Sequence, residues 1–322
     1  MKKPLLILTG PTAVGKTRLS IELAKKLQGS IISADSMQVY QYMDIGSAKI
    51  MPDEMEGIPH YLIDVLDPKE EFHVARFQEM AKEAMEEIYQ QGRLPILVGG
   101  TGFYIQALLK DVDFSSDSGQ SPIRRELEEK SRAEGPMVLH RMLQEVDPAS
   151  AEAIHPNNVK RVIRALEYYQ ETGTPISAHN AREMERESPY CFSYFVLNDE
   201  RKHLYERIDQ RVDLMMEQGL LDEVRSLKDR GCTQQMVSMK GLGYKELLSY
   251  LDGECSLEEA VEIIKRDTRH FAKRQITWFK REKEVVWLNK ADFAYDEDAI
   301  LEEILSIWKK RTEEMKSTQQ QV

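Results

Sequence analysis

Short apolar runs separated by amphipathic stretches predict that the chain begins with a parallel β-sheet. The runs are nearly uninterrupted, as expected for strands that are covered on both faces. Lys16–Leu27 and Arg76–Gln90 lie between them as predicted helices, and the second has apolar side chains every three to four residues. Strands that alternate with helices predict an α/β fold with helices on both faces of the sheet. The predicted strands are Leu5–Leu8, Ser30–Ala34, Leu94–Val98 and, as a fourth, Tyr61–Leu66.

The alternating pattern stops at Asp111–Ser121, a stretch rich in Asp, Ser and Gly that is typical of a linker. From Ser121 to Tyr169 the pattern is purely helical, and Ser121 followed by Pro122 is a typical helix start. A strand-like run returns at Phe192–Leu197. Residues 113–190 are therefore predicted to form an all-helical insertion in the α/β domain.

Helical patterns resume over Arg201–Arg281, and Val285–Leu288 predicts a last short strand. We therefore expect a discontinuous core domain at residues 1–112 and 191–295, followed by a C-terminal helix and tail at 296–322. The charged, Gln-rich residues beyond Lys309 are expected to fray.

Composition agrees with a globular cytoplasmic protein. The chain has 322 residues, of which 41% are hydrophobic, enough for one large or two modest cores. No apolar run approaches the roughly 20 residues that span a bilayer, so no membrane association is expected. The three cysteines are far apart and follow no metal-ligand spacing, which argues against disulfides and zinc. A monomer is the default expectation.

A phosphate-binding loop follows the first strand. Its eight residues match G-x-x-x-x-G-K-[ST] between a buried strand and a helix, which predicts a P-loop NTPase-like sheet. Backbone N–H groups and the helix N-terminus would bind phosphate oxygens, Lys16 would contribute a positive charge, and Thr17 a hydroxyl ligand for Mg²⁺. The motif predicts pyrophosphate binding without specifying the reaction. Its residues are Gly10, Pro11, Thr12, Ala13, Val14, Gly15, Lys16 and Thr17.

Two further segments follow predicted strands and should lie at the same edge of the sheet. Asp35 is a candidate Mg²⁺ ligand, a candidate general base, or the N-cap of the next helix. Gly99, Gly100 and Gly102 predict a tight turn with close backbone approach. The strand before this turn lacks the terminal Asp of a Walker B motif, which argues against an ordinary ATPase.

Three cationic segments each allow two interpretations. Arg207 and Arg211 share a helix face, either as surface ion pairs or as a clamp on phosphates. Lys240–Lys245 is suited to a nucleic-acid contact or to a turn between helices. Lys265–Lys283 has eight basic and two acidic residues although the whole chain has a net charge of −11. It is either a solvated helix face or, with its interleaved aromatic residues, a nucleic-acid surface.

Taken in order, these segments resemble the tRNA dimethylallyltransferase (tRNA isopentenyltransferase) family from about residue 4 to about residue 290. The ordered set is far more specific than a P-loop alone. The matching segments are the P-loop, Asp35-Ser36-Met37-Gln38-Val39-Tyr40, Gly57-Ile58-Pro59-His60 with Asp64-Val65, Val98–Gly102, Lys160–Glu167, the Arg207/Arg211 helix, Gly241–Tyr244, and Lys273-Arg274-Gln275 with Thr277-Trp278-Phe279.

The resemblance implies transfer of a dimethylallyl group from dimethylallyl diphosphate to N6 of adenosine 37 in tRNAs that read codons beginning with U. It implies that Lys16, a Thr17-bound Mg²⁺ and one of Arg207 and Arg211 stabilise the leaving diphosphate. Asp35 becomes the general base, and Thr101 orients the adenine edge or the diphosphate. The reacting nucleotide must be flipped out of its stack.

The resemblance also implies that the anticodon stem-loop contacts both the core and the insertion. Eukaryotic relatives in the family carry a C-terminal zinc finger that has no counterpart here, so the resemblance implies a bacterial-type enzyme. A P-loop kinase and a non-catalytic RNA-binding protein are the alternatives. The implied tRNA-binding residues are Asp35, Ser36, Met37, Gln38, Thr101, Arg124, Lys160, Arg161, Arg164, Lys240, Gly241, Gly243, Tyr244, Lys273 and Arg274.

Overall fold

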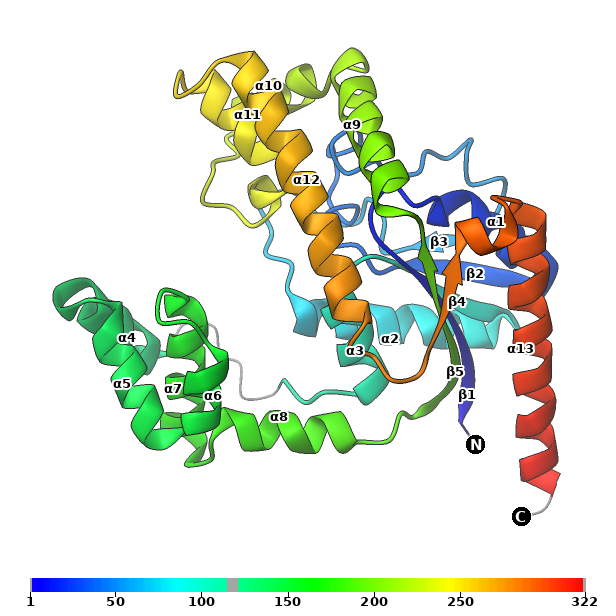
Figure 1. The fold of residues 1–322 in the computed structure, drawn as a ribbon, viewed down its shortest axis with the longest axis horizontal. Coiled ribbons are helices and arrows are strands. Elements are labelled where there is room, and N and C mark those ends of the chain that lie inside the picture. Colours follow the sequence, from blue (N-terminus) through cyan, green and yellow to red (C-terminus); the bar gives the residue numbers. More distant parts are fainter. Residues whose placement is uncertain (1, 115–120, 321–322) are drawn as a thin grey trace. The chain divides into compact units, whose positions relative to one another are not determined.

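The computed structural model describes residues 2–114 and 121–320. By the density of its internal contacts, the chain divides into two units, residues 1–108 with 190–322 and residues 109–189. The first unit contains an all-parallel sheet of six strands in the order β3-β2-β4-β1-β5-β6, counted within the described ranges (Figure 1). The prediction of an α/β fold with a parallel sheet is confirmed. The strands are β1 Lys3–Thr9, β2 Gly29–Ser33, β3 His60–Tyr61, β4 Leu94–Gly99, β5 Tyr190–Asn198 and β6 Val285–Asn289.

The two faces of the sheet are covered by different helices. Successive side chains of a strand point to opposite faces, so Leu6 and Leu8 of β1 lie on one face while Leu5 and Ile7 lie on the other. Leu6 and Leu8 share a core cluster with residues of α1 (Lys16–Leu27) and α13 (Glu297–Gln320). On the opposite side α2 (Val74–Gln90) packs against β2 and β4. All four β1 side chains are fully buried, which explains the uninterrupted apolar run.

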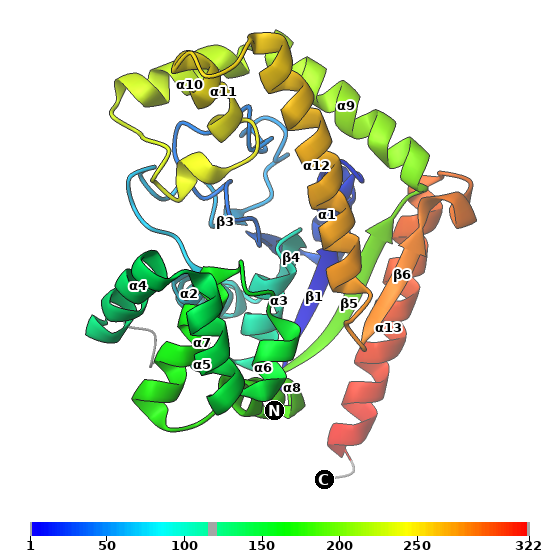
Figure 2. The ribbon, with the colours of Figure 1, turned by 60° about the vertical axis from the view of Figure 1, so that its left-hand side comes forward.

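The remaining helices of the first unit lie mostly after β5. Helix α9 packs against α12, and α11 packs against both α10 and α12. These four helices are gathered beyond one end of the sheet in Figure 2. Their bounds are α9 Arg201–Glu217, α10 Leu220–Asp229, α11 Tyr244–Leu251 and α12 Leu257–Phe279, with α3 Gly102–Lys110 following β4 and short 3-10 helices at Ser238–Lys240 and Lys290–Phe293.

Among its described residues, the second unit contains helices and their connecting turns, and it has its own apolar core. Leu127, Leu139, Leu143, Val162 and Leu166 are buried in it. Ser121 caps the first helix, because its hydroxyl accepts a hydrogen bond from the N–H of Arg124 at 3.2 Å. The helices are α4 Pro122–Glu134, α5 Pro136–Val146, α6 Pro148–Ala153, α7 Val159–Thr172 and α8 Ile176–Glu185.

One expectation about a single element is wrong. The strand expected at Tyr61–Leu66 ends at Tyr61. Leu62 and Asp64 have φ values of 62°, in the left-handed region that breaks a strand, and the Asp64 carboxylate binds the buried Lys49 ammonium at 2.7 Å. Beyond Lys309, α13 continues to Gln320, and the fraying expected of this stretch stays a prediction. Separately, no helix in the described part of the chain is long and apolar enough to cross a membrane.

Candidate active site

The P-loop connects β1 to α1 and requires glycine at two positions. Gly10 and Gly15 have φ values of 147° and 104°, which L side chains rarely adopt. A Cβ on Gly10 would lie 2.2 Å from the carbonyl oxygen of Leu197 on β5. The buried side chain of Val14 anchors the middle of the loop in the core. Helix α1 begins at Lys16, so its free N–H groups point from the loop toward whatever occupies the site.

The Lys16 ammonium group turns back over this loop. Its Nζ donates hydrogen bonds to the carbonyl oxygens of Gly10 at 3.0 Å and Pro11 at 2.8 Å. Burial, together with the positive charge of Arg211, lowers the pKa of Lys16 from 10.5 to about 8, and the Asp35 carboxylate opposes this shift. The site therefore concentrates positive charge in a desolvated place, where an anion gains most from it.

Helix α9 contributes both of its predicted arginines to the same cavity. Arg207 donates from Nε to the carbonyl oxygen of Ala13 at 2.9 Å, which ties α9 to the P-loop. Burial lowers the pKa of Arg211, an effect that Asp35 opposes and Arg207 adds to. Both arginines line a cavity of about 340 Å³ together with Lys16, Thr17 and Asp35. The phosphate-clamp interpretation fits this placement, whereas exposed surface ion pairs do not.

Asp35 follows β2 and is held at the cavity wall by its own backbone turn. Its Oδ1 accepts hydrogen bonds from the N–H of Met37 at 2.8 Å and of Gln38 at 3.4 Å. These bonds cap a turn rather than a helix, since residues 35–39 contain no helical segment. Oδ2 has no hydrogen-bond partner within the described residues. One carboxylate oxygen thus orients the side chain and the other is available for chemistry.

The rest of the Asp35–Gln38 segment is half-buried. Gln38 lines the cavity and donates to the carbonyl oxygen of Ala48 at 3.2 Å. Met37 points to Gly241, because a Cβ on that glycine would lie 2.6 Å from the Met37 methyl carbon. Two segments that the sequence associated with RNA, about 200 residues apart, are therefore neighbours.

The glycine-rich turn after β4 makes the close approach that its composition predicted. A Cβ on Gly99 would lie 2.3 Å from the carbonyl oxygen of Ala34, and Gly99 and Gly100 both line the cavity. Thr101 is placed differently from its neighbours. It donates from its N–H to Ala34 O at 3.2 Å and accepts at the start of α3 from the N–H of Tyr104, and it is not among the residues that line the cavity.

Gln275 of α12 is a site residue to which the sequence analysis assigned no role. Its side-chain oxygen accepts from the N–H of Thr12 at 2.9 Å, and its amide nitrogen donates to the carbonyl oxygen of Gly100 at 3.0 Å. Gln275 is buried, and Phe271, one turn earlier, also faces the cavity. One signal was available in the sequence: a polar residue in an otherwise apolar helical stripe of Ile264, Ala272 and Phe279.

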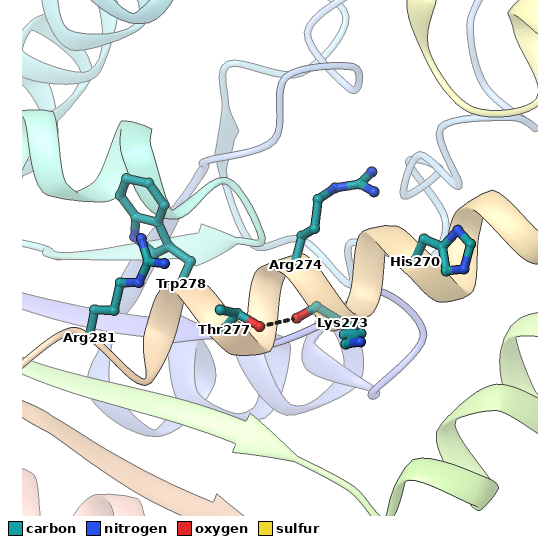
Figure 3. A pocket seen from close by; sticks show the side chains of 6 residues that line it. All are labelled: His270, Lys273, Arg274, Thr277, Trp278 and Arg281. Atoms are coloured by element: carbon teal, nitrogen blue, oxygen red, sulfur yellow. Dashed lines mark hydrogen bonds between the residues drawn. The ribbon is translucent and has the colours of Figure 1, made fainter. Parts of the chain in front are cut away.

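Another face of α12 carries the predicted cationic surface. Lys273 and Arg274 are exposed and, with Trp278, line a hollow of about 410 Å³ on the surface of the first unit (Figure 3). Phe103 of α3 packs edge-on against Trp278 with ring centroids 6.1 Å apart. Cations beside aromatic rings are common on surfaces that bind single-stranded nucleic acids.

The Lys240–Lys245 segment is only partly exposed. Lys240 is exposed and Gly241 half-exposed, whereas Gly243 and Tyr244 are buried. The Tyr244 hydroxyl donates to the carboxylate of Glu223 at 2.8 Å. The Tyr244 side chain therefore lies inside the protein, contrary to the expectation that it contacts tRNA.

In the second unit the predicted cations fall into two groups. The guanidinium group of Arg124 binds the buried Glu167 carboxylate at 2.6 Å, and that of Arg164 lies 3.6 Å from it. Lys160 and Arg161 at the start of α7 are exposed. Arg124 and Arg164 therefore stabilise the helical unit through Glu167. Lys160 and Arg161 instead face solvent.

Comparison with known proteins agrees with this geometry. The sequence pattern of the IPP transferase family matches residues 38–282. A tRNA dimethylallyltransferase of Lachnoclostridium phytofermentans is 61% identical over 95% of this chain and 97% of its own. The crystal structure of the full-length tRNA isopentenylpyrophosphate transferase from Bacillus halodurans is 44% identical, covers 97% of this chain and 99% of its own, and superposes with a TM-score of 0.73.

A third relative comes from a eukaryote. It is a dimethylallyltransferase solved while acting on tRNA, 32% identical over 91% of this chain and 75% of its own, with a TM-score of 0.78. The parallel sheet, the phosphate-binding loop and the charged cavity define a P-loop transferase. The chain belongs to the IPP transferase family, the tRNA dimethylallyltransferases.

Proposed function

We propose that this enzyme transfers the dimethylallyl group of dimethylallyl diphosphate to N6 of adenosine 37 in tRNAs that read codons beginning with U. The observation that carries the proposal is the meeting of Lys16, Arg207, Arg211 and Asp35 around one cavity. Three cations are suited to a diphosphate, and the Asp35 carboxylate in the same lining is suited to accept a proton from an attacking amine.

The reaction balances with these groups. The lone pair of N6 forms a bond to the allylic C1 carbon while the bond from C1 to the diphosphate oxygen breaks, and diphosphate leaves with that electron pair. The proton released from N6 passes to Oδ2 of Asp35, which accepts no hydrogen bond from the described residues. Because the exocyclic amine of adenine is a poor nucleophile, holding it in line with the carbon supplies much of the acceleration.

The leaving diphosphate is stabilised by fixed positive groups. Lys16 and Arg211 are desolvated before any anion arrives, so their interaction with developing negative charge is strong and needs little reorganisation. Arg207 is already held against the loop through Ala13. We assign Arg207 and Arg211 jointly to the leaving group.

The donor set fits a Mg²⁺ ion that is carried with the diphosphate. The exposed Thr17 lines the cavity, and Mg²⁺ prefers a few protein oxygens together with phosphate oxygens and water. Thr17 would hold the ion through its hydroxyl, and the ion would supply charge neutralisation on the diphosphate. No group of three or more His, Cys, Asp or Glu side chains suited to a metal occurs in the described ranges. Such an ion would therefore be held mainly through phosphate oxygens.

We assign tRNA binding to the exposed cations of each unit. In the first unit these are Lys240, Lys273 and Arg274, and in the second Lys160 and Arg161. Phosphate contacts from such side chains position the stem-loop. The adenine must leave its stack to reach the cavity, which costs a few kcal/mol and is least costly in a single-stranded loop.

One assay tests the function against its alternative. The protein is incubated with Mg²⁺, unmodified tRNA bearing A36-A37, and either labelled dimethylallyl diphosphate or labelled ATP. Label from the prenyl donor should enter tRNA, and a tRNA with A37 replaced by G should remain unlabelled. Phosphate transfer from ATP without prenylation would instead identify a P-loop kinase.

A further inference from the structure

A single carboxylate on α10 organises a loop that lies far from it in the sequence. Oε2 of Glu223 accepts hydrogen bonds from the N–H groups of Asp44 at 2.9 Å and Ile45 at 2.8 Å. Oε1 accepts from the N–H of Gly46 at 3.1 Å and from the Tyr244 hydroxyl at 2.8 Å. All four partners are donors, so the site is complementary to a carboxylate and to no other side chain of its size.

Tyr244 and Gly46 fit each other closely beneath this carboxylate. Tyr244, the first residue of α11, is fully buried. A Cβ added to Gly46 would lie 2.6 Å from the Tyr244 ring and 2.8 Å from its hydroxyl. The loop can therefore approach Glu223 only because residue 46 has no side chain.

The loop that Glu223 holds continues directly into the cavity wall. Ser47 and Ala48 line the cavity beside Asp35 and Gln38. Ala48 has a φ of 48°, in the left-handed region, and its carbonyl oxygen accepts from Gln38. The loop is thus held at its start by Glu223 and at its end by the same segment that carries Asp35.

Resting on the proposed function, we propose that Glu223 is a positioning residue for prenyl transfer. Through three backbone N–H groups it fixes the Ser47–Ala48 wall and, through Gln38, the turn of Asp35. The Ser47–Ala48 wall and the P-loop are different segments of the cavity lining. Glu223 therefore governs the alignment of the reacting groups and leaves diphosphate binding to the P-loop unaffected.

Glu223→Gln is the most specific substitution. It preserves the size of the side chain and removes only its match to the four hydrogen-bond donors. An amide presents an NH₂ group where the wild-type carboxylate accepts, so at least one donor of the loop or Tyr244 would face another donor. Asp222→Asn is the matched control, since Asp222 precedes Glu223 on the same helix and has a 79% exposed side chain.

The experiment has three readouts on each protein: kcat with tRNA and dimethylallyl diphosphate, the inhibition constant of inorganic diphosphate, and hydrogen exchange of the peptide covering residues 41–50. Glu223→Gln should exchange at least tenfold faster there and lose about tenfold to a hundredfold in kcat, the cost of roughly 1 Å of misalignment. Its inhibition by inorganic diphosphate should stay within twofold of wild type, and Asp222→Asn should match wild type throughout.

The outcomes separate this proposal from the function on which it rests. Faster exchange with unchanged kcat, or a parallel loss of diphosphate binding, overturns the positioning role of Glu223. A wild-type protein that does not prenylate tRNA overturns the proposed function and this inference with it. If Glu223→Gln does not fold, Tyr244→Phe removes one hydrogen bond and keeps the ring against Gly46. Tyr244→Phe should then show a smaller loss of kcat, with faster exchange of residues 41–50 and unchanged inhibition by inorganic diphosphate. Faster exchange with a kcat equal to that of wild type would contradict the proposal.

Discussion

The side chain of Gln275 joins α12 to the P-loop, because its oxygen accepts a hydrogen bond from the N–H of Thr12 at 2.9 Å. The same helix presents Lys273 and Arg274 to solvent. One helix therefore carries both a contact to the candidate diphosphate site, through Gln275, and the exposed cations of the candidate RNA surface.

Gln275→Glu should weaken donor binding without weakening tRNA binding. The new carboxylate can still accept from Thr12, but it faces the Gly100 carbonyl oxygen that the amide nitrogen now contacts at 3.0 Å. Two opposed acceptors in a buried place cost about 1–3 kcal/mol, roughly a tenfold loss of affinity or more for dimethylallyl diphosphate by calorimetry. Glu262→Gln, at an exposed position of α12, is the control. An affinity for dimethylallyl diphosphate equal to that of wild type would contradict the role of Gln275 as a bridge between Thr12 and Gly100.

Asp35→Asn should separate catalysis from binding. The amide oxygen can still accept from the N–H of Met37, so the turn is retained, but the side chain no longer takes a proton. Turnover should fall by about 10²- to 10⁴-fold, the range typical for loss of a general base, while tRNA affinity stays within twofold. Asp53→Asn, at an exposed position that does not line the cavity, serves as the control. Equal losses of turnover and tRNA affinity would reduce Asp35 to a structural cap.

Donor affinity should decrease as pH rises through about 8. The pKa of Lys16 is lowered to about 8 by burial and by Arg211, so the free enzyme loses this positive charge above that pH. Binding an anion must then also take up a proton, and affinity should fall by up to about tenfold per pH unit. Lys16→Arg keeps its charge throughout this range and should show no such decrease. A flat wild-type profile between pH 7 and 9.5 would contradict the prediction.

Lys273→Ala and Arg274→Ala should each weaken tRNA binding and reduce its salt dependence. A side chain that neutralises one phosphate contributes about one unit to the slope of log K against log salt. Binding measured between 50 and 300 mM KCl tests this, with Lys26→Ala on α1 as an exposed control. A slope of log K against log salt equal to that of wild type would mean that Lys273 and Arg274 face solvent and do not bind tRNA.

Glu167→Gln should destabilise the helical unit. Burial alone would raise the pKa of Glu167, but hydrogen bonds from Ser121 and Arg124 hold it below its usual value. The stabilisation is therefore present at neutral pH and is lost as pH falls through this lowered pKa. At pH 7 the loss should be about 1–3 kcal/mol, seen as faster proteolysis within residues 109–189. The exposed Glu171→Gln on α7 should match wild type, and a difference that persists unchanged at low pH would contradict the assignment.

The sequence predicted the secondary structure correctly where the local residue pattern determines it. Leu5 and Ile7 lie in a buried strand because that run is apolar on both faces, and Lys16 begins a helix because the preceding glycines end the strand. Tyr61–Leu66 was misassigned because an apolar pattern cannot reveal left-handed backbone at Leu62 and Asp64 or the ion pair of Asp64 with Lys49.

The sequence by itself determined the P-loop, the parallel sheet and the placement of Asp35 and the glycine turn at one edge, because each depends on the residues next to it. It could not reveal that Gln275 bridges Thr12 and Gly100, that Tyr244 is buried, or that Glu223 holds Gly46. Each of these contacts joins segments 21 to 263 residues apart, and such pairing is set by how helices pack over the sheet. Only the tertiary structure therefore decided which polar residues complete the wall and support of the active site.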